Sequence, residues 1–149
     1  MMHPMIQIIC AAIGTFGFSI FFRVRSAHLP FATLGGIISW SVYLLADIRF
    51  DVFISTLFAS FMICLWAELM ARVKKAPATV FLVPGIIPLL PGSALYYTMS
   101  GFVGKDHGLF LSKGSETLYT AIGIVGGILF ASELVRLWSG EHSGKINRN

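Results

Sequence analysis

Five apolar stretches dominate the 149-residue sequence, and each is about as long as a helix that crosses a membrane. They cover residues 5–22, 29–46, 52–70, 79–99 and 115–137. A bilayer core of ~30 Å needs about 20 mostly apolar residues in a helix. Hydrocarbon offers no hydrogen-bond partner to a free backbone, so we expect all five stretches to be helical. The sequence therefore predicts an all-α fold, a polytopic membrane bundle over residues 1–138 with about five transmembrane helices.

The composition agrees with a membrane protein and excludes several other classes. Only 12% of the residues are charged and 56% are hydrophobic, whereas about 25% are charged in an ordinary soluble domain. So few charges cannot cover a soluble surface, which excludes a soluble enzyme, a disordered chain and a nucleic-acid reader. Cys10 and Cys64 lie inside apolar runs and the four histidines are scattered. We therefore expect no disulfide framework, no metal, no cofactor and no catalytic site.

The distribution of Lys and Arg predicts an orientation. With five spans, eight of the 11 basic residues fall on the side of the C-terminal tail and three on the other side. The positive-inside rule then places the N-terminus outside and the C-terminus in the cytoplasm. The segment before the first stretch lacks Lys and Arg, so we interpret that stretch as a span and not as a cleaved signal peptide. The polar tail 139–149 is expected to be cytoplasmic and disordered.

The fourth stretch contains the strongest local signal, a P-G-x-x-P-x-x-P-G pattern from Pro84 to Gly92. A proline lacks an N–H, so the carbonyl four residues earlier loses its donor. The oxygens of Val80, Pro84 and Ile87 are therefore expected to lack their helical partners. Pro88 to Ser93 should lie near the bilayer midplane, where a broken helix is tolerated only if protein, water or a ligand supplies partners.

Broken helices at the midplane form the binding sites of many secondary transporters. A half-helix beginning at Gly92 would direct the N–H groups of Ser93 and its successors toward an anionic substrate group. Ser93 would cap that helix or touch the substrate directly. The alternative is a kinked helix whose prolines only shape packing. The residues expected to bind substrate are Pro84, Gly85, Pro88, Pro91, Gly92, Ser93 and Tyr96.

Carboxylates near the span ends have two interpretations. Glu68 is a candidate for proton or ion coupling, but Arg72 follows it by four residues, and an interfacial ion pair is the favoured interpretation. Glu133 and Arg136 are interpreted in the same way. Glu116 is expected to interact with the helix dipole at the start of the fifth span.

Other side chains in the spans have simpler interpretations. Hydroxyls such as those of Ser39 and Ser60 should bond back to helix carbonyls. Trp40 and most other Trp and Tyr residues lie near span ends, where they are expected to form an aromatic belt at headgroup depth.

The fourth stretch resembles the signature of the threonine/serine exporter family. The likeness rests on residues 84–92 followed by Tyr96 or Tyr97, on the lead-in 76–78, and on 22–23 with 35–43; it runs over most of residues 15–100. The resemblance implies a half-transporter, similar to the small C-terminal half of a complete exporter. Its partner would be a second five-span subunit with a soluble N-terminal region, in a bacterial cytoplasmic membrane.

The resemblance also implies the substrates, which are threonine and serine or, in two-chain versions, dicarboxylates such as succinate. Five-span halves have their ends on opposite sides and can pair as inverted repeats. A homo-oligomer is the alternative assembly. The alternative function is a non-transporting membrane scaffold or assembly subunit that uses small-residue faces such as Gly123 and Gly127. No P-loop is present, so direct use of ATP is not expected.

Overall fold

The computed structural model describes the backbone of residues 3–143 and the side chains of residues 3–138. All regular elements of the described chain are helices, which confirms the predicted fold class. Its elements are α1 (Pro4–Phe21), α2 (Leu29–Asp47), α3 (Val52–Lys74), α4 (Thr79–Ile86), the 3₁₀ helix η1 (Ile87–Leu89), α5 (Gly92–Val103) and α6 (His107–Ser143).

Four of these helices, α1, α2, α3 and α6, are long and apolar enough to cross a membrane. The pair Thr79–Leu89 and Gly92–Val103 meets the same test when taken together, and its two halves are bent by 53°. If this bent pair is one span, the described residues contain five candidate spans, as the sequence predicts.

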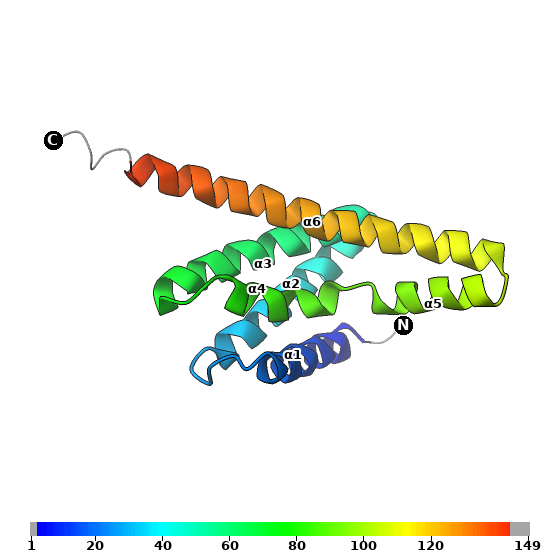
Figure 1. Cartoon of the computed structure of the whole chain (residues 1–149), viewed down its shortest axis with the longest axis horizontal. Helices are drawn as coiled ribbons and strands as arrows, with labels where there is room; N and C mark the ends of the chain where they lie inside the picture. Colours follow the sequence, from blue (N-terminus) through cyan, green and yellow to red (C-terminus); the bar gives the residue numbers. More distant parts are fainter. Residues whose placement is uncertain (1–2, 144–149) are drawn as a thin grey trace.

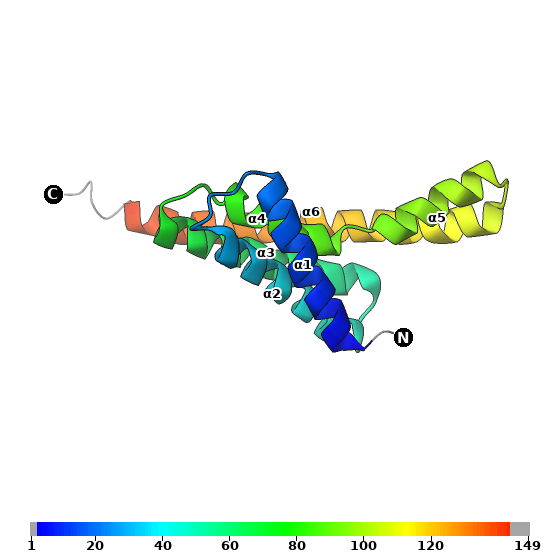
Figure 2. The ribbon, with the colours of Figure 1, turned by 90° about the horizontal axis from the view of Figure 1, so that it is seen from below.

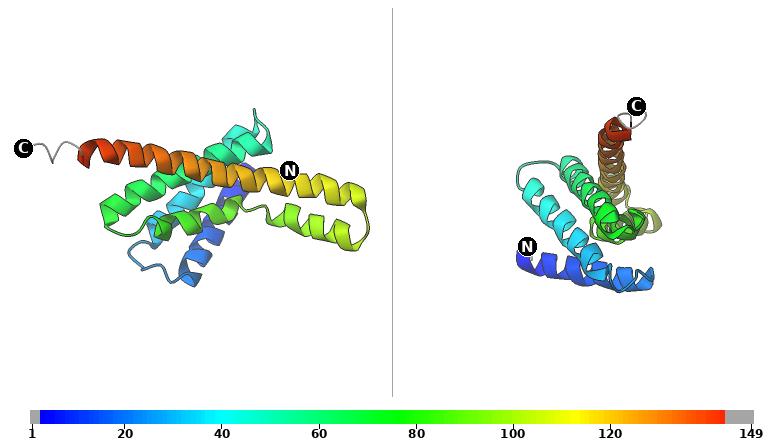
Figure 3. Two further views of the ribbon diagram at one scale, coloured as in Figure 1. Left: turned by 45° about the horizontal axis from the view of Figure 1, so that its top comes forward. Right: turned by 90° about the vertical axis from the view of Figure 1, so that its left-hand side faces the viewer.

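The spanning helices lie side by side in the order α1, α2, α3, α6, each packed against the next (Figures 1 and 3). α4 packs against α2 and α3, and η1 packs mainly against α1 and α2. Beyond the break, the chain leaves this group of helices. α5 packs chiefly against the first part of α6, and the two form a hairpin that projects past the other helices (Figures 1 and 2).

Small and hydroxylated residues fill much of the interior beside a few large apolar side chains such as Phe81 and Ile63, whereas many other large apolar side chains are exposed. Thr15, Ser39, Thr56 and Ser60 are all fully buried, while Phe21 is 76% exposed. This distribution is opposite to that of a soluble core and suits a bundle whose outer surface faces lipid. The expected back-bonds are present, because Thr56 Oγ1 donates to Val52 O at 2.7 Å and Ser60 Oγ to Leu57 O at 3.0 Å.

Glycines set the closest approaches between helices. A Cβ added at Gly36 of α2 would overlap the Thr15 side chain of α1. A Cβ added at Gly127 of α6 would overlap Ser60 Oγ and the backbone oxygen of Leu57 on α3. Ser60 Oγ also lies 3.2 Å from Gly123 O across the same interface. The small-residue face of the fifth span therefore packs inside the chain, against α3.

The start of the last helix differs from the expectation. α6 begins at His107 and not near residue 115, because Asp106 Oδ1 accepts a hydrogen bond from Leu109 N–H at 3.0 Å and starts the helix. Glu116 therefore lies inside the helix, where its carboxylate pairs with Lys113 Nζ at 2.7 Å. The dipole interaction expected for Glu116 at a helix start is wrong.

The end of α6 confirms one expectation and corrects another. The Glu133–Arg136 ion pair is confirmed at 3.6 Å. The expected disorder of the tail is wrong where the structure describes it, because residues 139–143 continue α6. No proline interrupts the helix in this segment. Residues 144–149 lie outside the described residues.

Neighbouring glycines on α6 provide a test of this packing. We expect Gly127→Ala to destabilise the folded protein by about 1–3 kcal/mol, the usual cost of overpacking a tight contact. Gly126→Ala should be tolerated, because its Cβ would lie 3.8 Å from Leu57 Cδ1, an ordinary contact. Thermal melting in detergent compares the two variants. Equal melting temperatures would contradict the close α3–α6 packing.

Candidate functional site at the broken helix

The break between α4 and α5 is formed by three prolines in three different positions. Pro84 lies inside the last turn of α4, Pro88 in η1, and Pro91 immediately before α5. Leu90 adopts an extended conformation with φ −64° and ψ 133°, which ends the 3₁₀ turn. The break divides the bent pair into nearly equal halves, so its extended segment lies near the middle of the fourth span.

Most of the backbone freed by the prolines finds a partner nearby. Ile87 N–H donates to Pro84 O, and Leu90 N–H donates to Ile87 O at 3.2 Å. Pro84 O and Ile87 O lose their α-helical donors as expected, and the protein itself supplies new donors, because the residue before each proline forms a 3₁₀ bond instead. Gly92 N–H then donates to Leu90 O at 2.8 Å.

A side chain from a neighbouring helix ties the α4 side of the break to α2. Ser39 Oγ lies 2.8 Å from Gly85 O and 3.0 Å from Gly36 O, so its single proton serves two carbonyls. Ser39 is fully buried. The sequence identified Ser39 only as a hydroxyl inside a span, and its role at the break was missed. The pairing needs the α2–α4 contact, which no local pattern shows.

Glycines bring the α4 side of the break deep into the bundle. A Cβ at Gly85 would overlap Ile63 on α3 and lie 3.5 Å from the backbone carbon of Gly35. A Cβ at Gly35 would lie 2.7 Å from Ile63 Cδ1. Pro84 and Gly85 are both buried. Gly85 therefore packs closely against α2 and α3, and Pro84 is buried next to it.

Pro88 lies at the surface of the break. It lines a groove of about 290 Å³ between α1 and α2, together with Gln7, Cys10, Ala11 and Trp40. Trp40 Nε1 is buried and has no hydrogen-bond partner within the described residues. Trp40, which the sequence places only in an interfacial aromatic belt, therefore lines the same groove as Pro88 of the broken segment.

The α5 side of the break is open. Pro91 is half-buried, Gly92 and Ser93 are exposed, and a Cβ at Gly92 would meet nothing within 4 Å. No side chain caps α5; in its first turn Leu95 N–H donates to Pro91 O at 2.9 Å. The N–H groups of Ser93 and Ala94 consequently stand at an uncapped helix start, where the helix dipole favours negative charge.

The seven predicted residues are therefore not gathered into one cavity. Pro84 and Gly85 are buried among α2 and α3, Pro88 faces the groove at α1, and Gly92 and Ser93 are exposed. Tyr96 is 69% exposed and packs edge to face with Tyr97, with ring centroids 5.5 Å apart. The residues on the α4 side of the break are thus buried or line a groove, and those on the α5 side are mostly exposed.

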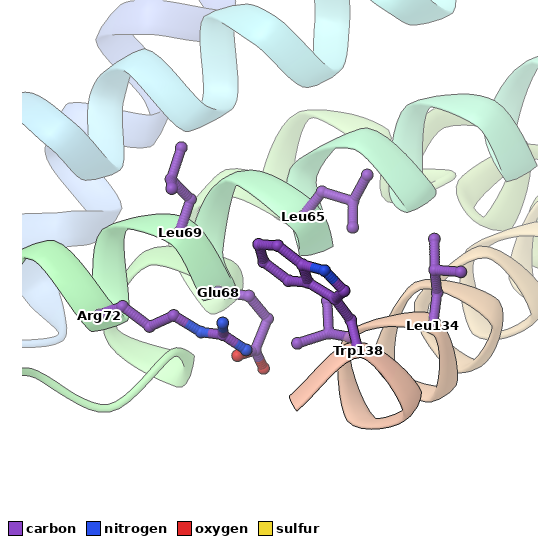
Figure 4. A pocket seen from close by; sticks show the side chains of 7 residues that line it. Leu65, Glu68, Leu69, Arg72, Leu134 and Trp138 are labelled. Atoms are coloured by element: carbon purple, nitrogen blue, oxygen red, sulfur yellow. The ribbon is translucent and has the colours of Figure 1, made fainter. Parts of the chain in front are cut away.

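Glu68 lies in a different place, in a groove of about 440 Å³ between α3 and the last turns of α6. Its carboxylate and the guanidinium of Arg72 lie toward each other beside Trp138 (Figure 4). The Arg72 guanidinium carbon is 5.6 Å from the Trp138 ring centroid. The remaining lining is apolar, and none of the residues of the break lines this groove. The structure does not bring Glu68 to the broken helix.

Two comparisons with known proteins found nothing and one found a family. The model of a family described as "Threonine/Serine exporter, ThrE" matches residues 7–134. No curated protein and no solved structure was found to match the chain. The matched range includes all of α1 to α5 except the first three residues of α1, and most of α6.

The Ser39 contact generates a prediction about the stability of the break. Removing its hydroxyl in Ser39→Ala leaves a buried carbonyl with one donor fewer, and we expect a loss of about 0.6–2 kcal/mol in folding free energy. Ser41→Ala is the control, because the half-buried Ser41 makes no hydrogen bond within the described side chains. Thermal melting in one detergent measures both. If both variants melt alike, the Ser39–Gly85 bond does not hold the break.

Proposed function

Because the chain belongs to the threonine/serine exporter family, we propose that it is one subunit of a secondary exporter with its substrate site at the break between α4 and α5. The substrate class is small amino acids such as threonine and serine, or small carboxylic acids. We further propose that it lies in a bacterial cytoplasmic membrane with the N-terminus outside and the C-terminus in the cytoplasm.

The observation that carries the proposal is the exposed, uncapped start of α5 beside an extended segment. Gly92 and Ser93 are exposed and their helix begins without a side-chain cap. A substrate carboxylate at this position accepts hydrogen bonds from the first N–H groups of α5. It also lies at the end of the helix where the dipole favours negative charge. Both kinds of proposed substrate carry such a carboxylate, so this geometry suits their shared group.

The openness of the site supports a two-subunit transporter. One wall of the site is provided by α4, η1 and the start of α5, and the hairpin of α5 with α6 stands away from α1 and α2 (Figure 2). A second five-span subunit in inverted orientation would supply the missing wall. We propose that this subunit carries a soluble N-terminal region, and a homo-oligomer is the alternative.

Glu68 is the residue considered for proton or ion coupling. It is half-buried in the α3–α6 groove beside Arg72, away from the residues of the break. This placement favours a structural role for its carboxylate at the proposed cytoplasmic surface. The ion that drives export is therefore not assigned to this residue.

Efflux from proteoliposomes tests the site. We expect Pro91→Ala combined with Gly92→Leu to slow the export of labelled serine, threonine or succinate at least tenfold, because a continuous helix with a leucine at its first turn covers the freed N–H groups. The assay uses the chain reconstituted with a candidate five-span partner, and also alone.

Gly17→Leu is the matched control. Gly17, like Gly92, is exposed and has no atom within 4 Å of an added Cβ, so the two positions start with equal room for a side chain. We expect Gly17→Leu to export normally. Unchanged efflux in the double variant would remove the break from the transport path, and absence of efflux with every partner would favour the scaffold function.

A further inference from the structure

A second pocket lies at the proposed cytoplasmic end of the bundle, apart from the exposed start of α5. The loop after α1 and the segment leading into α4 line an open pocket of about 390 Å³. Arg23, Arg25 and His28 line it from one side, and Thr79, Val83 and Pro84 from the other. Only Pro84 is shared with the residues of the break.

The charge in this pocket is unbalanced. Two arginine residues, both exposed, line it, and no aspartate or glutamate does. Neither Arg23 nor Arg25 forms an ion pair within the described residues, in contrast to Lys113 and Arg136 on α6. Two arginines with free donors match the oxygens of a carboxylate or a phosphate, which they bind through charge-assisted hydrogen bonds.

His28 adds a polar group to the pocket wall. Its ring packs edge to face on buried Phe81, with centroids 5.6 Å apart, which holds it against α4. Its Nδ1 is buried and has no hydrogen-bond partner within the described residues. The helices alone therefore do not satisfy the polar groups at this end of the fold.

A Schellman motif fixes the backbone at Arg23. Val24 N–H donates to Ser19 O at 3.0 Å and Arg23 N–H to Ile20 O at 2.9 Å, the two bonds of a Schellman motif that ends α1. Arg23 occupies the left-handed position of this motif with φ 54°, where glycine is the usual residue because other side chains are strained there. The motif places Arg23 directly after α1, beside the pocket, in the conformation that Lys75 and Lys105 also adopt at helix ends.

We propose that this pocket is a binding site for an anionic carboxylate or phosphate group, held by Arg23 and Arg25. The group belongs either to a small solute or to the headgroup of an anionic lipid. Both sources present the same oxygens to the guanidinium groups. The assignment stands on the pocket and not on the proposed export, so it survives if the protein does not transport.

Binding to the full-length protein tests the proposal. The protein is placed in phosphatidylcholine nanodiscs, and inorganic phosphate or succinate is titrated at constant ionic strength by calorimetry. In a second arm, native mass spectrometry measures whether phosphatidylglycerol is retained over phosphatidylcholine. Saturable binding of a solute assigns the site to solutes, and selective retention of phosphatidylglycerol assigns it to lipid. Failure of both arms overturns the proposal.

The variants separate the pocket from general surface charge. We expect Arg23→Gly to weaken binding at least tenfold in the positive arm while leaving the melting temperature unchanged or higher, because glycine relieves the strain. Val83→Trp should weaken binding by filling the pocket without changing the charge. Lys74→Gln with Lys75→Gln removes two charges from the same end, and neither lysine lines the pocket. If this control weakens binding as much as Arg23→Gly, the pocket is not a specific site.

Efflux is measured on the same variants. If Arg23→Gly abolishes binding and export persists, the anion site is separate from transport and the proposed function stands. If binding persists in a protein that exports nothing, the proposed function fails and the anion site stands.

Discussion

A backbone inside a bilayer must find its hydrogen-bond partners within the protein. In this chain, the prolines of the break before α5 remove several of the N–H donors that a continuous helix would supply. The 3₁₀ bonds to Pro84 O and Ile87 O satisfy two carbonyls, and Ser39 supplies a donor to Gly85 O from α2. These bonds stabilise the α4 side. The α5 side begins without a cap and stays exposed. The asymmetry makes the start of α5 the chemically available part of the span.

The packing of the remaining helices follows from the same environment. Apolar side chains gain little by leaving lipid, so helices associate through small residues that allow close contact. Gly36 allows α1 to approach α2, and Gly35 allows α3 and α4 to approach α2. Gly127 allows α6 to approach α3. The hydroxyls of Ser39 and Ser60 bond across these contacts. The hairpin of α5 and the first part of α6 lacks such contacts with α1 and α2.

The apolar segments and the place of the break could be predicted from the sequence, because apolar length and proline act locally. The early start of α6 was missed, since Asp106 caps a helix outside the apolar run. Ser39 at Gly85 O and the basic pocket were also missed, because both join segments far apart in the sequence. The prolines predict that the carbonyls of Pro84 and Ile87 lose their α-helical donors. The 3₁₀ bonds that replace these donors could not be predicted, because they depend on how the chain tightens at the break.

The central claim is that water and solutes reach the start of α5 within the membrane span. Labelling of Ser93→Cys with a membrane-impermeant maleimide, in a chain whose Cys10 and Cys64 are replaced, measures this directly. Val125→Cys is the control, because Val125 lies on α6 with its side chain 56% exposed toward the expected lipid face. We predict rapid labelling at position 93 and none at position 125. Equal protection of both cysteines would contradict the claim.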